Sequence, residues 1–157
     1  PSAARGRVPR MAAETEEGEG MSRSGYCDDI EQWDLIRWRG AVKSAMHGSR
    51  GQAFLKEMLA ALDALPVKRL LADGLQDEYD DGAVCAMGAV GRLRHIDMTK
   101  LDPYDRESVA GKFGIADAMA AEIAFENDDG AGYWSKETPE ERYSRMRRWV
   151  EASIINK

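Results

Sequence analysis

The sequence predicts a mainly α-helical protein, in which five or six helices pack as a compact bundle around one core. Apolar residues recur every three to four positions along most of the chain after residue 21, which is the period of an amphipathic helix. Capping residues precede several of these runs, and such residues mark helix starts. With 157 residues, 43% of them apolar, the chain has the size of one domain, which we place at residues 22–157.

Residues 1–21 differ from the rest of the chain because they are small, charged and turn-forming, with little to bury. Such a segment cannot offset the entropy cost of ordering its backbone, so we expect a disordered tail. A secretory signal would need an apolar stretch of about 7–15 residues, which this segment lacks. Met21 is a more typical start than Pro1, so two interpretations stay open: a native tail and an over-extended reading frame.

Two helices are predicted before residue 66. The first follows Asp28 and Asp29, either of which can cap its free N–H groups, and its buried stripe would contain Leu35, Trp38, Val42, Ala45 and Met46. The second begins at Ser49, which forms a capping pattern with Gln52. It ends before Pro66, after a broad apolar face made of Phe54, Leu55, Met58, Leu59, Leu62 and Leu65. Trp33 and Trp134 fall on no buried stripe.

Residues 67–95 admit two interpretations. Two Asp-Gly turn signals flank an acidic run in this segment. The window 83–95 places small and apolar residues on one stripe, which favours a helix whose Gly88 and Gly91 let another element approach closely. A short β-hairpin around residues 68–87 is the alternative.

Three further helices are predicted in the second half of the chain. One begins at Asp102-Pro103 and runs to about residue 114, and another covers 115–126. The last follows Thr138, which is a capping residue with proline next to it and Glu141 placed to bond back. Its apolar stripe comprises Tyr143, Met146, Trp149, Val150 and Ile154.

Charge and cysteine content exclude several classes of protein. The chain has 28 acidic and 22 basic residues, a net charge of −6, so it lacks the basic balance of duplex-DNA-binding proteins. No apolar run approaches the roughly 18 residues that a membrane-spanning helix needs. The two cysteines are too few for a disulfide scaffold. Cysteine and histidine residues lie at least nine positions apart, without the paired spacing of zinc sites, so we expect no metal and no cofactor.

Two residue sets point to alternative functions. Cys85 lies near a predicted helix start, where a thiolate is favoured, so a small cysteine-dependent hydrolase or transferase is one alternative. However, a cysteine among alanine, valine and methionine is usually an inert core residue. The other alternative is a nucleic-acid binder that uses arginines of the last helix, beside its aromatic residues: Arg142, Arg145 and Arg148. Nearby glutamates offset these arginines.

Acidic residues gather in three places and predict a binding surface for a basic protein. The candidate binding residues are Asp28, Asp29 and Glu31, then Asp77, Glu78, Asp80 and Asp81, and finally Asp128 and Asp129. Because carboxylates can take the place of phosphates, the expected partners include nucleic-acid-binding proteins. This hypothesis expects the three clusters to share one face, whereas simple solubility would not require it.

Three motifs resemble a group of small proteins encoded by bacteria, prophages and phages. These motifs are Cys85-Ala86-Met87-Gly88-Ala89, the dipeptide Asn127-Asp128, and the Thr-x-x-Glu cap of the last helix. The resemblance implies a bacterial or phage origin and a cytoplasmic location, and it supplies no catalytic residues. In physical terms, the small residues allow tight helix contacts, and Asn127 and Asp128 can bond free backbone groups at a helix end.

The function hypothesis that follows is a non-enzymatic, acidic accessory factor that binds another protein. The resemblance suggests that a phage or mobile element encodes it. Inhibition of a host nucleic-acid-binding defence system is one form that this role could take.

Overall fold

The computed structural model describes residues 8–9, 22–80, 82–132 and 134–155. Within these ranges the chain forms six α-helices: α1 (Gln32–His47), α2 (Ser49–Ala64), α3 (Ala86–Leu93), α4 (Arg106–Phe113), α5 (Asp117–Asp129) and α6 (Pro139–Ser153). A single 3-10 turn, η1 (Met98–Lys100), precedes α4. The predicted helical bundle is confirmed. None of the described helices combines the length and apolar content needed to cross a membrane.

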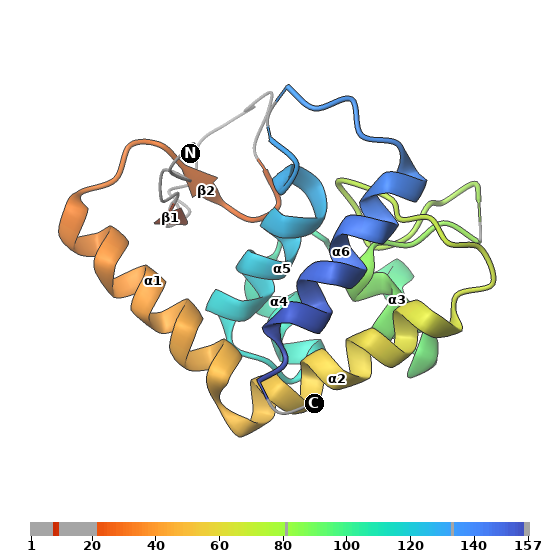
Figure 1. The fold of residues 1–157 in the computed structure, drawn as a ribbon, viewed down its shortest axis with the longest axis horizontal. Helices are drawn as coiled ribbons and strands as arrows, with labels where there is room; N and C mark the ends of the chain where they lie inside the picture. Colours follow the sequence, from red (N-terminus) through yellow and green to blue (C-terminus); the bar gives the residue numbers. More distant parts are fainter. Residues whose placement is uncertain (1–7, 10–21, 81, 133, 156–157) are drawn as a thin grey trace.

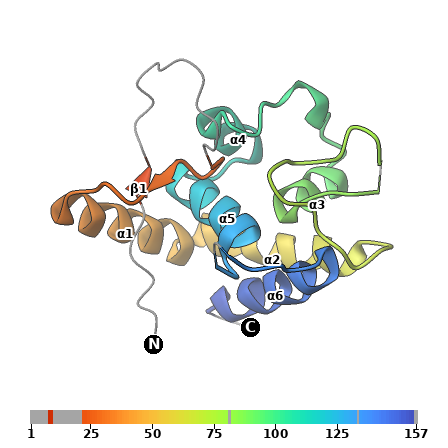
Figure 2. The same ribbon diagram turned by 90° about the horizontal axis from the view of Figure 1, so that it is seen from above.

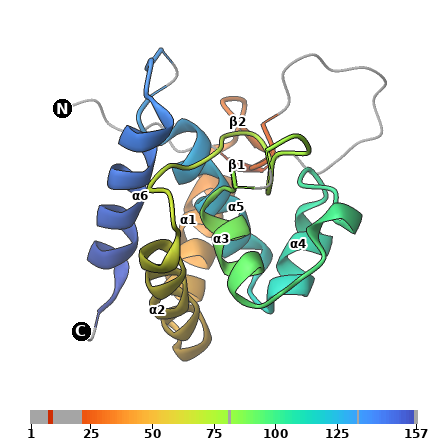
Figure 3. The same ribbon diagram turned by 90° about the vertical axis from the view of Figure 1, so that its right-hand side faces the viewer.

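Two helices, α2 and α5, hold the bundle together. Helix α2 contacts α1, α3 and α6, while α5 contacts α1, α3, α4 and α6. Seen from the side, α6 and α4 lie on opposite sides of the molecule with α5 and α3 between them (Figure 3). Helix α1 lies at one edge, and its N-terminal end forms the extreme left of the molecule (Figure 1).

The segment predicted as a disordered tail contains one described element. Strand β1 (Val8–Pro9) pairs antiparallel with β2 (Tyr26–Cys27). The other residues of the segment 1–21 lie outside the described residues.

The predicted apolar stripes form the core. In α2, Phe54, Leu55, Met58 and Leu62 are all buried, as are Tyr143, Met146 and Val150 in α6. Helix α1 contributes less, because only Val42 and Met46 of its stripe are fully buried. Trp33 and Trp134, which matched no buried stripe, are both exposed.

The capping box of α6 is confirmed. Thr138 Oγ1 accepts a hydrogen bond from Glu141 N at 3.1 Å, and a Glu141 carboxylate oxygen accepts one from Thr138 N at 3.4 Å. Together these bonds satisfy two N–H groups that would otherwise lack partners in the first turn.

The predicted caps of α1 and α2 are wrong. Glu31, not Asp28 or Asp29, precedes the first residue of α1, and its side chain makes no capping bond. Ser49 lies inside α2, where Gly48 takes the capping position. Each of these helices starts where packing places it, without help from a side-chain cap.

The corner between α1 and α2 explains why α2 starts there. Gly48 is the one residue between them, and a Cβ atom on Gly51 would lie 1.9 Å from the carbonyl oxygen of Ala45. Gln52 Nε2 donates to Met46 O at 2.8 Å and to Ser153 O at 3.0 Å. Its amide therefore ties the corner to the end of α6 instead of capping α2.

The middle segment contains the predicted helix, which begins at Ala86 as α3. The alternative hairpin is present only as an isolated antiparallel bridge between Gln76 and Val84. Leu71 N also donates to Val84 O at 2.8 Å. The loop before α3 is therefore held to residues 71–76, although no regular strand forms among its described residues.

The boundaries of α4 and α5 differ from the predicted ones. Helix α4 begins at Arg106, because Asp105 rather than Asp102 accepts the capping bond, from Ser108 N. Helix α5 continues to Asp129. Asn127 and Asp128 therefore lie in its last turn and not in a loop after it.

Gly88 of α3 provides a direct test of this packing. A Cβ atom there would lie 2.0 Å from the carbonyl oxygen of Leu75, so we expect Gly88→Ala to lower the free energy of unfolding by about 1–3 kcal/mol or more. Gly111, an exposed glycine of α4, has nothing within 4 Å of its Cβ position. Gly111→Ala should therefore raise stability by up to about 1 kcal/mol. Urea denaturation measures both, and equal effects would contradict the packing described here.

Candidate functional site

The motif residues of α3 and α5 meet at one buried site, together with an arginine from the N-terminal segment. Arg23 pairs with both carboxylate oxygens of Asp128, with Nε–Oδ2 at 2.6 Å and Nη2–Oδ1 at 2.8 Å. Its Nη1 donates to Gly74 O at 2.9 Å and to the sulfur of Cys85 at 3.3 Å. We call Arg23, Cys85, Asn127 and Asp128 the Arg23 cluster.

Asn127 joins three parts of the chain within this cluster. Its Oδ1 accepts a bond from Ala86 N, the first residue of α3, at 3.0 Å. Its Nδ2 donates to Leu71 O and to Asp128 Oδ1, both at 2.8 Å. The expected role of Asn127, bonding a free backbone group at a helix end, therefore matches the contacts.

The Arg23 cluster lies almost entirely out of solvent. The side chains of Arg23 and Asp128 are 3% and 2% exposed. Burial acts to lower the pKa of Arg23, but its contacts with Cys85 and Asp128 outweigh burial and raise this pKa above the usual value. The guanidinium therefore stays charged, and its charge is matched by that of the Asp128 carboxylate.

Cys85 occupies a structural position in this cluster. It is the N-cap of α3, its sulfur accepts a bond from Gly88 N at 3.2 Å, and the residue is fully buried. These contacts favour the interpretation of Cys85 as an inert core residue over that of a nucleophile. Among the described residues, no three histidine, cysteine or acidic side chains lie close enough together to hold a metal ion.

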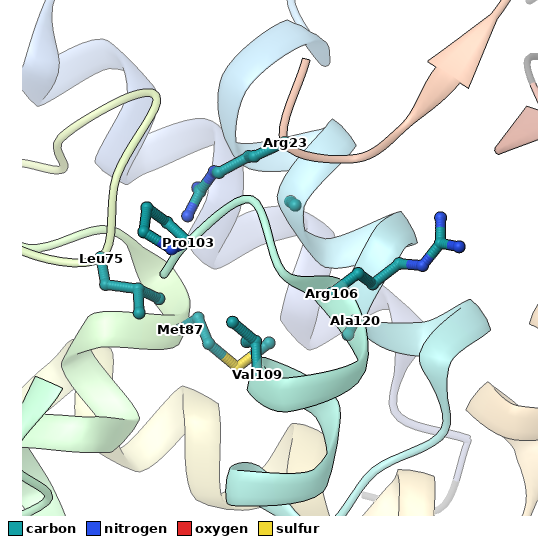
Figure 4. Close-up of a pocket in the computed structure, with 8 residues that line it drawn as sticks. Arg23, Leu75, Met87, Pro103, Arg106, Val109 and Ala120 are labelled. Carbon is teal, nitrogen blue, oxygen red and sulfur yellow. The ribbon is translucent and has the colours of Figure 1, made fainter. Parts of the chain in front are cut away.

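A small cavity lies beside the cluster, between α3, α4 and α5 (Figure 4). Its volume is about 20 Å³, which is enough for about one water molecule. The lining is mostly apolar, with Leu75, Met87, Val109 and Ala120, and the guanidinium of Arg106 points away from it (Figure 4).

The acidic residues do not share one face, so that expectation is wrong. Asp28, Asp29 and Glu31 are exposed before α1, whereas Asp77, Glu78 and Asp80 lie in the loop before α3. Figures 1 and 2 show the start of α1 and this loop at opposite ends of the molecule. Asp81, which belongs to the same acidic run, is outside the described residues.

Two residues of the third acidic cluster are used internally. The Asp128 side chain is buried against Arg23, so its assignment to the binding surface is wrong. Asp129 is partly buried and accepts a bond from Ser22 Oγ at 3.5 Å. Asp80, in the second cluster, pairs with Arg69 at 2.5 Å. The cluster before α1 is therefore the best remaining candidate for an acidic surface.

The arginines of α6 do not form an open basic patch. Arg142 donates to Leu70 O at 3.0 Å, and Arg145 forms a two-pronged pair with Glu137 at 2.7 and 3.0 Å. Arg148 is exposed. Since two of the three guanidinium groups fix the α6 region to neighbouring segments, the predicted nucleic-acid patch is not assembled.

A surface of which only Asp29 and Glu31 were predicted as binding residues lies on the N-terminal half of α1. Trp33 is 71% exposed and Ile36 is 51% exposed, and residues three apart on a helix are neighbours on its surface. The exposed carboxylates of Asp29, Glu31 and Asp34 lie at the same end of the helix. We call Asp29, Glu31, Trp33, Asp34 and Ile36 the α1 patch.

The opposite side of α1 is held by a polar hub at Glu122 of α5. A carboxylate oxygen of this residue accepts bonds from Tyr26 OH at 2.6 Å and from Arg39 Nη1 at 2.8 Å. Trp38 Nε1 donates to Tyr26 OH at 3.1 Å, and the guanidinium of Arg106 lies 5.5 Å from the Trp38 ring centre. These contacts fix the rotation of α1, which leaves Trp33 and Ile36 facing outward.

The hub depends on the proton of the Tyr26 hydroxyl. Burial and the neighbouring Glu122 carboxylate both raise the pKa of Tyr26. Glu126 lies one turn further along α5, and its own burial, together with the charge of Glu122, raises its pKa. Tyr26 therefore remains a hydrogen-bond donor at neutral pH.

The Arg23–Asp128 pair generates a stability prediction. Asp128→Asn leaves the buried guanidinium without a matching charge, so we expect a loss of about 3–5 kcal/mol in the free energy of unfolding. Asp63→Asn is the matched control, because the Asp63–Arg147 pair is exposed and screened by solvent. Chemical denaturation should show a much smaller loss for the control. Comparable losses would mean that burial of the Arg23–Asp128 pair does not increase its effect on the free energy of unfolding.

Cys85 generates a reactivity prediction. In the Cys27→Ser variant, a thiol reagent at about pH 6 should label Cys85 only after denaturation, because burial denies the reagent access to the sulfur. A Cys85→Ser variant, which keeps the partly exposed Cys27, serves as the control. Rapid labelling of native Cys85 would instead favour the cysteine-dependent enzyme.

Comparisons with protein-family models, with curated proteins and with solved structures find no match to this chain. The contacts described above therefore carry the functional interpretation. They give the Arg23 cluster a structural role and leave the α1 patch as the candidate binding site.

Proposed function

We propose that this chain is a non-enzymatic binding protein that docks on a protein partner through the α1 patch. The observation that carries the proposal is the exposure of Trp33 and Ile36 as neighbours on one helix face. Large apolar side chains that are exposed side by side, as these two are, are typical of interaction sites. Tryptophan in particular is enriched among the residues that dominate binding energy.

The charge of the α1 patch supports a basic partner. Asp29, Glu31 and Asp34 place three carboxylates near the apolar pair, against the cations of Arg37 and of Arg39, the latter already paired with Glu122. Asp34 and Arg37 are 3.8 Å apart and well exposed, so their mutual attraction is weak. Carboxylates near an apolar pair speed the encounter with positively charged surfaces and disfavour binding to acidic ones.

The internal use of the reactive groups supports a role without catalysis. Each of the three groups is hydrogen-bonded in the interior. The sulfur of Cys85 and the carboxylate of Asp128 accept bonds from Arg23, and the amide oxygen of Asn127 accepts one from Ala86 N. The adjacent cavity has room for about one water molecule. A substrate would need a cleft where these groups converge.

A nucleic-acid-binding protein is the partner class that we favour. Such proteins carry basic surfaces, and carboxylates of the α1 patch would compete there with phosphate groups. The resemblance of the motif residues to phage and prophage proteins agrees with a cytoplasmic accessory role, including inhibition of a host defence system.

Capture from a bacterial lysate tests the proposal. The intact chain should retain a protein at low salt and release it as salt increases, because the carboxylates of the α1 patch act through charge. The double variant Trp33→Ala/Ile36→Ala should bind the captured protein at least about 30-fold more weakly. Tyr104→Ala removes a comparably exposed aromatic side chain outside the patch, so it should leave binding unchanged.

Two outcomes would contradict parts of the proposal. Retention of the same protein by the double variant would exclude the α1 patch as the docking site. Once the partner is purified, added duplex DNA or RNA should displace it from the chain. Insensitivity to both would exclude competition with phosphate while leaving the docking site in place.

A further inference from the structure

We infer that the exposed face of α1 also pairs with the α1 of a second copy of this chain, in an antiparallel arrangement. The inference rests on the proposed function in that it concerns the same face. Its basis is that this face is complementary to itself, in shape and in charge, when one copy is turned end over end.

The face extends along the whole helix. Positions three and four apart share one side of a helix, and here those positions are all exposed: Trp33, Ile36, Arg37, Gly40, Ser44 and His47. With 16 residues, α1 offers a length of roughly 24 Å. A second helix can therefore lie along it.

The two halves of the face have opposite shapes. The N-terminal half projects Trp33 and Ile36, whereas Gly40 and Ser44 leave a flat stretch before His47. Nothing lies within 4 Å of the Cβ position of Gly40. In an antiparallel pair, the large side chains of each copy would lie over the small residues of the other. The two-fold axis of such a pair repeats this contact in both directions.

The two ends also have opposite charge. Asp29, Glu31 and Asp34 lie at the N-terminal end, whereas Lys43 and, in the first turn of α2, Arg50 lie exposed near the C-terminal end, with Arg37 between the two groups. An antiparallel pair brings each acidic end beside a basic end, whereas a parallel pair would bring like charges together. Charge thus selects the antiparallel arrangement.

The area available sets the strength of the pair. A stable interface buries about 800 Å² on each partner, which is more than one face of a helix of this length offers. We therefore expect a dimer that dissociates readily, with a Kd above about 1 μM. A captured partner and a second copy would compete for the face.

Sedimentation equilibrium of the intact chain, over about 1 to 500 μM, tests the inference. The apparent mass should rise toward that of a dimer with concentration. Gly40→Arg places a long side chain at the centre of the face and should hold the chain as a monomer. Gly111→Arg is the matched control, because Gly111 is also an exposed helical glycine with nothing within 4 Å of its Cβ position. This control should dimerise like the unmodified chain.

Charge exchange tests the antiparallel arrangement. The variants Glu31→Lys/Asp34→Lys and Lys43→Glu/Arg50→Glu should each remain monomeric, because each gives both ends of α1 the same sign. Mixed together, they should form a heterodimer, since every acidic end then meets a basic one. Failure of the mixture to associate, where the unmodified chain dimerises, would overturn the arrangement.

The outcomes separate this inference from the proposed function. An unmodified chain that stays monomeric at the highest concentration overturns the inference and leaves capture of a partner unaffected. A dimer that persists in Gly40→Arg also overturns it, because the contact would then lie elsewhere. Dimerisation that Gly40→Arg abolishes, without any captured partner, supports the inference and contradicts the proposed function.

Discussion

The buried pair between Arg23 and Asp128 is the contact on which the arrangement of this bundle depends. It joins the N-terminal segment to the last turn of α5, across 105 positions of sequence. Removing two charges from water is costly, and only good geometry with further hydrogen bonds offsets that cost. Here Gly74 O and the Cys85 sulfur occupy the third guanidinium nitrogen, while Asn127 and the backbone N–H of Asp73 donate to the carboxylate.

The position of α1 follows from this pair. With Arg23 fixed, Tyr26 lies three residues further along the same segment and reaches Glu122 of α5. Glu122 in turn accepts a bond from Arg39, so polar contacts add to the apolar packing that holds one side of α1. The apolar stripe of α1 needs to bury little beyond Val42 and Met46. The patch at Trp33 and Ile36 is thus a consequence of how the N-terminal segment is anchored.

Local patterns were sufficient to predict most helices, because their signals are contained within a few turns. The apolar stripe of α2 and the Thr138 cap of α6 are examples, and both depend on neighbours in sequence. Ile36 could also have been found this way, since it lies three residues after Trp33 and outside the buried stripe.

The Arg23 cluster could not be predicted from such patterns. Asp128 is followed by Asp129 and Gly130, a composition typical of a solvated loop. Helix α5 nevertheless continues through it, because Asn127 finds partners in Leu71 and Ala86 that are distant in sequence. The predicted cap of α2 failed for the same kind of reason: the corner at Gly51 and Gln52 determines where α2 begins, and its partners include the end of α6. Contacts between distant segments override local preference at both places.

The two tryptophans of α1 differ in their contacts: Trp38 helps to anchor the helix, whereas Trp33 does not. Trp38 donates a hydrogen bond to Tyr26 and its ring lies 5.5 Å from the guanidinium of Arg106, so its removal would disturb the anchoring of α1. Trp33 lies five residues earlier, on the other side of the helix, and is largely exposed to solvent. An apolar side chain stabilises a fold in proportion to the area that it buries, and Trp33 buries little. The stability of the bundle therefore gives no reason for a tryptophan at position 33, whereas an interface provides one.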